Sequence, residues 1–150
     1  MKERLKIIGV IGASSCDEKV YKKALELGKL LAEKGYAVVC GGLGGVMRAV
    51  CEGAERAGGI TIGILPGKYS SDANPFVKIP IVTAMSHARN AIIVRTADAV
   101  VAVGGRYGTL SEIALALAID KKVISLETSW NIRGVIKAKS PEEAVKIIGK

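Results

Sequence analysis

Short apolar segments alternate along this chain with longer segments in which apolar residues recur every three or four positions. The short segments are rich in Val, Ile and Leu, as expected of strands that are buried on both faces of a sheet. They cover residues 5–11, 36–40, 61–65, 79–82, 99–103 and 123–126, with a possible short edge strand at 135–138. The longer segments predict amphipathic helices. They cover residues 17–34, about 46–57, about 84–96, 110–120 and a last helix that begins at Pro141.

Regular alternation of strands and helices predicts an α/β fold. We expect a single Rossmann-like, three-layer domain over residues 1–150, with a mostly parallel sheet of about six or seven strands and helices on both faces. The composition agrees, because 49% of the residues are hydrophobic and only 4% are aromatic. In such folds the loops after the strands meet at the carboxyl edge of the sheet, and ligands bind there.

Charge and cysteine content narrow the choice of partners. The net charge of +8 favours anionic ligands, but the lysines are scattered, and one Trp and one Phe offer little for base stacking. A small anionic molecule is therefore expected rather than a nucleic acid.

Three cysteines without a C-x-x-C pair indicate a reduced, cytoplasmic chain. The first residues, Met1 to Lys6, lead straight into a strand without a signal-peptide core, and no apolar segment reaches the ~18–20 residues of a membrane helix.

The strongest chemical signal lies in residues 98–112, where an apolar strand ends in a glycine-rich turn and a helix follows at once. Glycines in this turn permit positive φ and close approach of the backbone to a ligand. The free N–H groups of the next helix favour an anion, so we expect a phosphate site here. The predicted contacts are Gly104, Gly105, Arg106, Gly108 and Thr109.

Residues 41–45 form a second glycine-rich turn between a strand and a helix. Gly42, Gly44 and Gly45 are predicted phosphate contacts, although the segment lacks the third glycine of G-x-G-x-x-G and the Lys-Ser/Thr of a P-loop. The alternative is a tight turn that binds nothing. Ser14 and Ser15 follow the first strand and would either donate hydroxyls to the phosphate or cap the first helix.

Glu112 and Arg89 are the candidate reactive residues. Thr109 and Glu112 have capping-box spacing, so Glu112 either caps its own helix or stabilises positive charge on a sugar, as carboxylates do in glycoside hydrolysis. Arg89 is expected in the first or second turn of the helix from Ala84, where a cation opposes the helix dipole unless an anion is nearby. A solvated surface arginine is the alternative.

The remaining polar residues give weaker signals. His87 is a possible proton donor, although single histidines are more often structural, and Lys68 and Arg48 are minor candidates. Cys40 and Cys51 are expected as small core residues. No cluster of His, Cys, Asp or Glu has metal-ligand spacing, so no metal is expected.

Three motifs together resemble the lonely-guy superfamily, long described as lysine decarboxylase-like. They are Gly41-Gly42-Leu43-Gly44-Gly45-Val46-Met47, Ser86-His87-Ala88-Arg89-Asn90 and Gly104-Gly105-Arg106-Tyr107-Gly108-Thr109-Leu110-Ser111-Glu112. The resemblance covers residues 5 to 127 or so and implies a Rossmann-like oligomer that cleaves nucleoside 5′-monophosphates to base and ribose 5-phosphate. It implies that Arg89 and Glu112 are the catalytic pair and that the reaction needs no cofactor.

Three departures point to a neighbouring branch of the superfamily. The hydrolases usually have Pro, Met and Lys where this chain has Val103, Ser86 and Asn90. These changes resemble the branch of molybdenum-cofactor carrier proteins, which is distantly similar to DNA-processing protein A. The alternative function is therefore a carrier that binds a phosphorylated cofactor without turnover. The apolar run 91–94 further predicts a homo-oligomer, either a dimer or a dimer of dimers.

Overall fold

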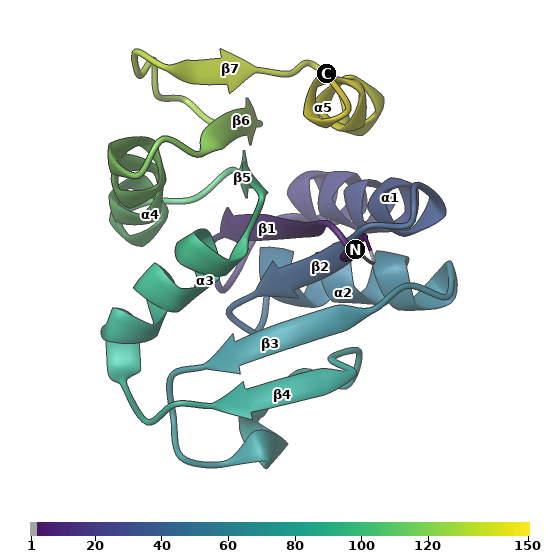
Figure 1. Ribbon diagram of the computed structural model, residues 1–150, viewed down its shortest axis with the longest axis vertical. Helices are drawn as coiled ribbons and strands as arrows, with labels where there is room; N and C mark the ends of the chain where they lie inside the picture. Colours follow the sequence, from purple (N-terminus) through teal and green to yellow (C-terminus); the bar gives the residue numbers. More distant parts are fainter. Residues whose placement is uncertain (1–2) are drawn as a thin grey trace.

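The computed structural model describes residues 3–150 as one sheet of seven parallel strands in the order β4-β3-β2-β1-β5-β6-β7 (Figure 1). The strands are β1 (Ile7–Gly12), β2 (Ala37–Cys40), β3 (Thr61–Leu65), β4 (Ile79–Val82), β5 (Ala99–Val103), β6 (Lys122–Leu126) and β7 (Val135–Lys137). The helices are α1 (Glu18–Glu33), α2 (Val46–Arg56), α3 (Asn90–Thr96), α4 (Tyr107–Ala118) and α5 (Pro141–Ile148). The predicted α/β, Rossmann-like fold is confirmed.

Helices cover both faces of the sheet, which makes three layers. Figure 1 shows α1, α2 and α5 on one face and α3 and α4 on the other. Neighbouring strand residues point to opposite faces, so Val101 packs under α1 and α2 while Val100 packs under α3 and α4. Both side chains are fully buried. The aliphatic core predicted from composition therefore fills both spaces between the layers.

The strand order reverses between β1 and β5. The chain adds β2, β3 and β4 on one side of β1, then returns to place β5, β6 and β7 on the other side. Gly12 at the end of β1 is paired with Val103 at the end of β5. Because connections leave these two strands in opposite directions, a crevice opens beyond their carboxyl ends, where ligands of such sheets bind.

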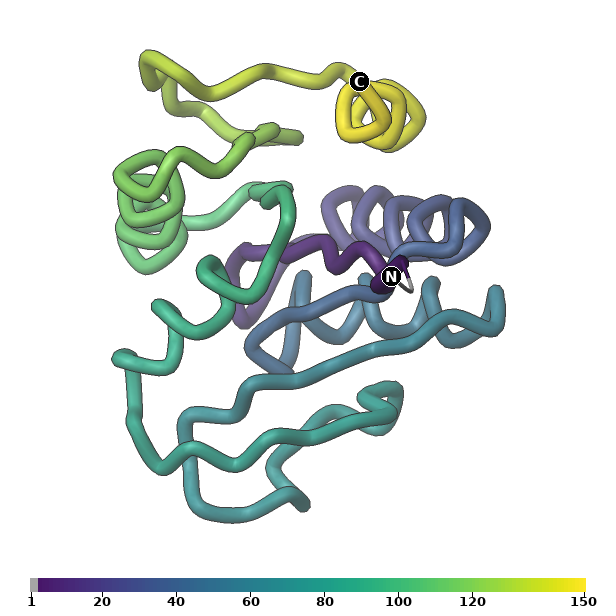
Figure 2. Tube along the Cα trace, viewed as in Figure 1, coloured from purple at the N-terminus to yellow at the C-terminus, as the bar shows by residue number. Residues whose placement is uncertain are grey.

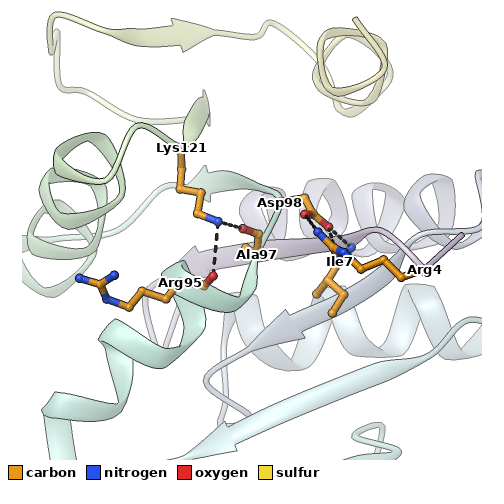
Figure 3. A network of polar contacts seen from close by, with 6 residues as sticks. All are labelled: Arg4, Ile7, Arg95, Ala97, Asp98 and Lys121. Atoms are coloured by element: carbon orange, nitrogen blue, oxygen red, sulfur yellow. Dashed lines mark hydrogen bonds and ion pairs between the residues drawn. The ribbon is translucent and has the colours of Figure 1, made fainter. Parts of the chain in front are cut away.

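Polar contacts fix the opposite, amino edge of the sheet (Figure 3). The carboxylate of Asp98 accepts hydrogen bonds from the Arg4 guanidinium at 2.7 Å and from the Ile7 N–H at 2.9 Å. The ammonium of Lys121 donates to the carbonyl of Ala97 at 2.6 Å, at the end of α3. These contacts hold the α3–β5 turn far from the crevice and leave the carboxyl edge free for a ligand.

The last segment of the chain follows its sequence signals closely. The predicted edge strand is β7, and α5 returns beside α1, as the tube in Figure 2 shows. Ser140 caps α5 because its hydroxyl oxygen accepts a hydrogen bond from the Glu143 N–H at 3.1 Å. The Glu143 carboxylate accepts from the Lys139 N–H in return. The predicted proline in the first turn is Pro141.

Two predicted helix starts were wrong. The helix expected from Ala84 begins as a 3-10 turn over Ser86–Arg89 and becomes α3 only at Asn90. The cause is positive φ at Ala84 and Ser86, which no α-helix accepts. The helix expected from Leu110 begins instead at Tyr107, because Arg106 takes the N-cap position.

No helix among residues 3–150 combines the length and apolar character needed to span a membrane. Met1 and Lys2, which open the segment expected to lead into the first strand, lie outside the described residues.

Candidate functional site

A pocket of about 510 Å³ occupies the crevice where the strand order reverses. Its walls come from the loops after β1, β2 and β3, from the 3-10 turn before α3, and from the start of α4. The polar lining residues are Ser14, Ser15, Ser86, His87, Arg89, Asn90, Arg106, Thr109 and Glu112. Apolar side chains such as Val10, Met47 and Ile93 form the rest of the surface. The pocket therefore gathers polar groups from segments far apart in the sequence.

The β5–α4 turn (residues 104–106) ends the strand with its backbone in the left-handed region. Gly104 has φ of 56° and Gly105 has φ of 100°. None of the hydrogen bonds found among residues 3–150 engages the first three N–H groups of α4, at positions 107–109. Arg106 and Gly108 are exposed and line the pocket, so these donors lie where an anion would approach.

The β2–α2 turn (residues 41–45) packs against the protein itself. A Cβ atom on Gly45 would lie 2.4 Å from the Ala13 carbonyl oxygen, and one on Gly42 would lie 2.6 Å from the Leu65 side chain. The first N–H of α2, that of Val46, already donates to the Ala13 carbonyl. This turn contributes Gly41 and Leu43 to the pocket lining. The lining does not include the predicted contacts Gly42, Gly44 and Gly45, nor Gly104 and Gly105 of the other turn.

Ser14 and Ser15 line the pocket and do not cap the first helix. The N-cap of α1 is Asp17, whose carboxylate accepts a hydrogen bond from the Val20 N–H at 2.9 Å. The side chains of both serines are exposed at the pocket surface. The structure excludes the N-cap role, and the contact of these serines with a phosphate stays a prediction.

Arg89 is buried, with 7% of its surface exposed, so it is no solvated surface arginine. Its Nε donates to the Ile64 carbonyl at 2.9 Å, its Nη2 to the Gly41 carbonyl at 3.5 Å, and its Nη1 to the Asn90 amide oxygen. A Cβ at position 41 would approach Nη2 to 2.6 Å, which explains the glycine there. Arg89 thus ties the ends of β2 and β3 to the 3-10 turn and lines the pocket.

Glu112 is 8% exposed and lines the pocket from the second turn of α4. It cannot cap this helix because the helix begins five residues earlier, at Tyr107. No hydrogen bond or ion pair within 4 Å engages its carboxylate among residues 3–150. Burial raises the pKa of Glu112 from 4.5 to about 7, and the charge of Arg89 opposes that rise. Glu112 is thus a largely buried residue whose carboxylate lines the pocket without a protein partner, which is typical of a site built for a ligand.

The weaker candidates differ in whether they line the pocket. His87 is exposed and lines the pocket, whereas Lys68 and Arg48 do not, and Arg48 stacks over the Phe76 ring at 5.2 Å. Cys40 and Cys51 are fully buried, as predicted, with their sulfur atoms 3.5 Å apart. Within the described residues no group of three or more His, Cys, Asp or Glu side chains could hold a metal ion.

Sequence reasoning missed Asn74, which shapes the pocket from behind. Its Nδ2 donates to the Leu43 carbonyl at 2.9 Å, and its N–H donates to the Gly42 carbonyl at 2.8 Å. Its own amide oxygen accepts from the Phe76 N–H. The loop after β3 is thereby fastened to the β2–α2 turn. An isolated Asn in a polar loop carries no sequence signal for this role.

Comparisons with known proteins identify relatives of this chain. A protein of Archaeoglobus fulgidus is 51% identical over 142 residues, covering 95% of this chain and 93% of the relative. A probable cytokinin riboside 5′-monophosphate phosphoribohydrolase of Oryza sativa is 38% identical over 113 residues, which is 71% of this chain. The chain spans about half the length of that plant relative, since the match covers 49% of it.

Among solved structures, the molybdenum cofactor binding protein of Rippkaea orientalis superimposes with a TM-score of 0.94. It is 39% identical, and the match covers 99% of this chain and 98% of that one. The model of the SLOG cluster4 family matches residues 5–149. The chain therefore belongs to the SLOG cluster4 family, within the lonely-guy superfamily.

Proposed function

We propose that this protein hydrolyses the N-glycosidic bond of a nucleoside 5′-monophosphate. The observation that carries the proposal is the position of Glu112, a largely buried residue whose carboxylate lines the pocket without a protein partner, near the start of α4. The first-turn N–H groups of α4 and the guanidinium of Arg106 would bind the phosphate. The family's phosphoribohydrolase relatives support the same reaction class.

The reaction needs positive charge to be stabilised on the sugar. The bond between the anomeric carbon and the base nitrogen breaks, and its electron pair leaves with the base. Water then adds to the anomeric carbon, and one of its protons ends on the base. Glu112, as a carboxylate, would stabilise the cationic sugar and accept hydrogen bonds from ribose hydroxyls. Arg89, held on the Ile64 and Gly41 carbonyls, would position Glu112 and the phosphate through its charge.

Replacing the carboxylate tests this proposal directly. Glu112→Gln keeps the size of the side chain but removes its charge, so base release from AMP, GMP, CMP and UMP should fall by about 100-fold or more. Glu55→Gln, at an exposed position of α2, is the matched control and should leave the rate unchanged. Chromatography of the released base provides the measurement. Equal rates for Glu112→Gln and wild type would refute the mechanism.

A carrier without turnover is the second candidate, and one specific observation favours it. The side chain of Asn90 accepts a hydrogen bond from Arg89 and adds no positive charge to the pocket. The molybdenum cofactor binding protein of Rippkaea orientalis resembles this chain along almost its full length. Stoichiometric binding of a phosphorylated cofactor, with no base released from any nucleotide of the panel, would establish the carrier function.

We further propose that the protein is a homo-oligomer in the cytoplasm. Ile93 and Val94 of the run that suggested a second copy are buried in the core, and Ile92 is half-buried. Exposed apolar side chains instead gather on β4 and just after it. They are Ile79, Ile81, Val82 and Met85. Sedimentation at micromolar concentration should show a dimer or a tetramer, and a monomer would contradict the proposal.

The free cysteines fit the reducing conditions of the cytoplasm. Fractionation of the source cells would test the proposed location.

A further inference from the structure

Two cysteines that the proposed reaction does not use lie in contact at the two ends of the β2–α2 connection. Cys40 is the last residue of β2, and Cys51 lies in the second turn of α2. Both are fully buried in the core that α1 and α2 form with the sheet (Figure 1). Their sulfur atoms are 3.5 Å apart and both are free thiols. A disulfide needs its sulfur atoms at about 2.0 Å, so a shift of about 1.5 Å would join them.

Cys40 has the more reactive sulfur atom of the pair. The hydrogen bond from the Cys51 thiol lowers the pKa of Cys40, and the Gly42 N–H and the charge of Arg89 act in the same direction, against the effect of burial. The Gly42 N–H donates to the Cys40 sulfur at 3.4 Å. The thiolate is the form of cysteine that attacks an oxidant. The surroundings of this pair therefore make Cys40 the attacking sulfur and leave Cys51 as the thiol that reacts second.

The cysteine pair lies close to the pocket without lining it. Gly41, the residue after Cys40, is part of the pocket lining, and so is Met47, whose carbonyl oxygen lies 4.0 Å from the Cys40 sulfur. Cys40 itself has no exposed surface. An oxidant that reaches it from the pocket therefore has to be small, and hydrogen peroxide belongs to that class.

The end of β2 can move more easily than the helix that carries Cys51. A Cβ atom on Gly53 of α2 would lie 1.9 Å from the Leu25 carbonyl oxygen, so the backbones of α1 and α2 are in direct contact. Such close packing leaves α2 little room to shift. Cys40, in contrast, is followed by two glycines at positions 41–42, whose backbone accepts a wide range of conformations. Closure of a disulfide would therefore move Cys40 towards α2.

This movement would disturb Arg89 through Gly41. The Gly41 carbonyl accepts a hydrogen bond from Nη2 of Arg89, and a Cβ atom at position 41 would lie 2.6 Å from the same nitrogen. Arg89 thus packs directly on the residue that follows Cys40. Because Arg89 lines the pocket, a shift at Gly41 would change the position of a cationic group of the ligand site.

We propose that Cys40 and Cys51 form a reversible disulfide with hydrogen peroxide as the oxidant, and that this bond weakens ligand binding through Arg89. The Cys40 thiolate attacks one peroxide oxygen, the O–O bond breaks, and the hydroxide that leaves takes up the proton lost from Cys40. The Cys51 thiol then attacks the resulting sulfenic acid, whose S–O bond breaks to release the second water. Two thiols are oxidised and one peroxide is reduced to two waters. The effect on affinity rests on the proposed function, whereas the formation of the bond does not.

Mass spectrometry of the folded, peroxide-treated protein tests the bond itself. The protein should become lighter by two hydrogen atoms, peptide mapping should find Cys40 joined to Cys51, and dithiothreitol should restore both thiols. Cys16→Ser changes the half-buried third cysteine and is the matched control, which should form the bond as wild type does. Cys40→Ala, or Cys51→Ala if the first variant does not fold, should form none. The inference is overturned if both thiols stay free at a peroxide concentration that oxidises them in the urea-unfolded protein.

Calorimetry with ribose 5-phosphate tests the effect on the ligand site. The oxidised wild-type and Cys16→Ser proteins should bind it at least about 10-fold more weakly than the reduced proteins, and dithiothreitol should restore the affinity. Cys40→Ala should bind equally before and after peroxide. Dithiothreitol does not reduce methionine sulfoxide, so recovery excludes oxidation of Met47 as the cause.

The two measurements separate failure of this inference from failure of the proposed function. A disulfide that forms without a change in affinity would overturn the coupling to Arg89. If the reduced wild-type protein does not bind ribose 5-phosphate, the proposed function fails and the coupling fails with it. Mass spectrometry would still decide, in that case, whether Cys40 and Cys51 form the bond.

Discussion

The two glycine-rich turns at the carboxyl edge look alike in sequence but differ in what surrounds them. The β2–α2 turn is closed against the chain itself, through contacts with Ala13 and Leu65, and Asn74 fastens it from behind. The β5–α4 turn leads into a helix whose first N–H groups have no partner among the described residues, next to the exposed Arg106. Close packing explains a glycine in each turn, since a Cβ on Gly45 would lie 2.4 Å from the Ala13 carbonyl oxygen and one on Gly105 would lie 2.3 Å from the Thr109 hydroxyl oxygen. The two turns differ instead in the N–H groups that follow them, which are unpaired only after the β5–α4 turn.

The largest expected difference in stability is between variants of Arg89, which donates to the β2–α2 turn, and of Arg106, which lies in the β5–α4 turn. Arg89→Met removes donors from the Ile64 and Gly41 carbonyls and should lower the free energy of unfolding by about 4 kcal/mol. Arg106→Met, at an exposed position, should leave stability within about 0.5 kcal/mol of wild type. It should weaken ribose 5-phosphate binding about 10-fold. Urea unfolding and calorimetry measure the two effects, and a stability loss for Arg106→Met equal to that for Arg89→Met would abolish the contrast.

Replacing one glycine of each turn with alanine gives the next largest expected difference in stability. Gly45→Ala places a methyl group 2.4 Å from a backbone oxygen at φ of 59°, so we expect a loss of about 3 kcal/mol. Gly104→Ala meets nothing closer than 3.7 Å at φ of 56°, so the cost should be only that of the left-handed backbone, about 1 kcal/mol. Thermal unfolding compares the variants. Equal losses would show that both turns are packed alike.

The Glu112 carboxyl group lowers the stability of the folded protein at high pH. Its pKa is about 7 in the folded protein against 4.5 in the unfolded chain, so the folded state binds more protons between these values. Stability therefore falls as the pH rises from about 4.5 to 7, by up to about 3 kcal/mol. Glu112→Gln removes this cost and should be more stable than wild type at pH 8 but similar at pH 4. A variant less stable than wild type at pH 8 would contradict the assignment.

The smallest effect concerns the loop after β1, which packs against the β2–α2 turn and lines the pocket. Asp17→Ala removes the N-cap of α1 and should cost about 1 kcal/mol without changing ligand affinity. Ser14→Ala and Ser15→Ala should leave stability unchanged and weaken ribose 5-phosphate binding about 3-fold each. The same unfolding and calorimetric measurements apply. A stability loss in the serine variants would mean that their hydroxyl groups serve the fold.

Local patterns predicted the strands well and the site residues only in part. The runs over Thr61–Leu65 and Ala99–Val103 match β3 and β5 because buried parallel strands are continuous apolar segments. Periodicity could not reveal the left-handed backbone at Ser86, which delays α3. The partners of Arg89 at Gly41 and Ile64 are distant in sequence, so its burial became visible only in the folded chain.

The central claim is that the open β5–α4 turn, and not the closed β2–α2 turn, binds the phosphate. A crystal structure with ribose 5-phosphate tests it most directly. We predict phosphate oxygens within about 3 Å of the N–H groups at positions 107–109, with the anomeric carbon facing Glu112. A phosphate bound at residues 41–45 instead, or a sugar that points away from Glu112, would contradict the account.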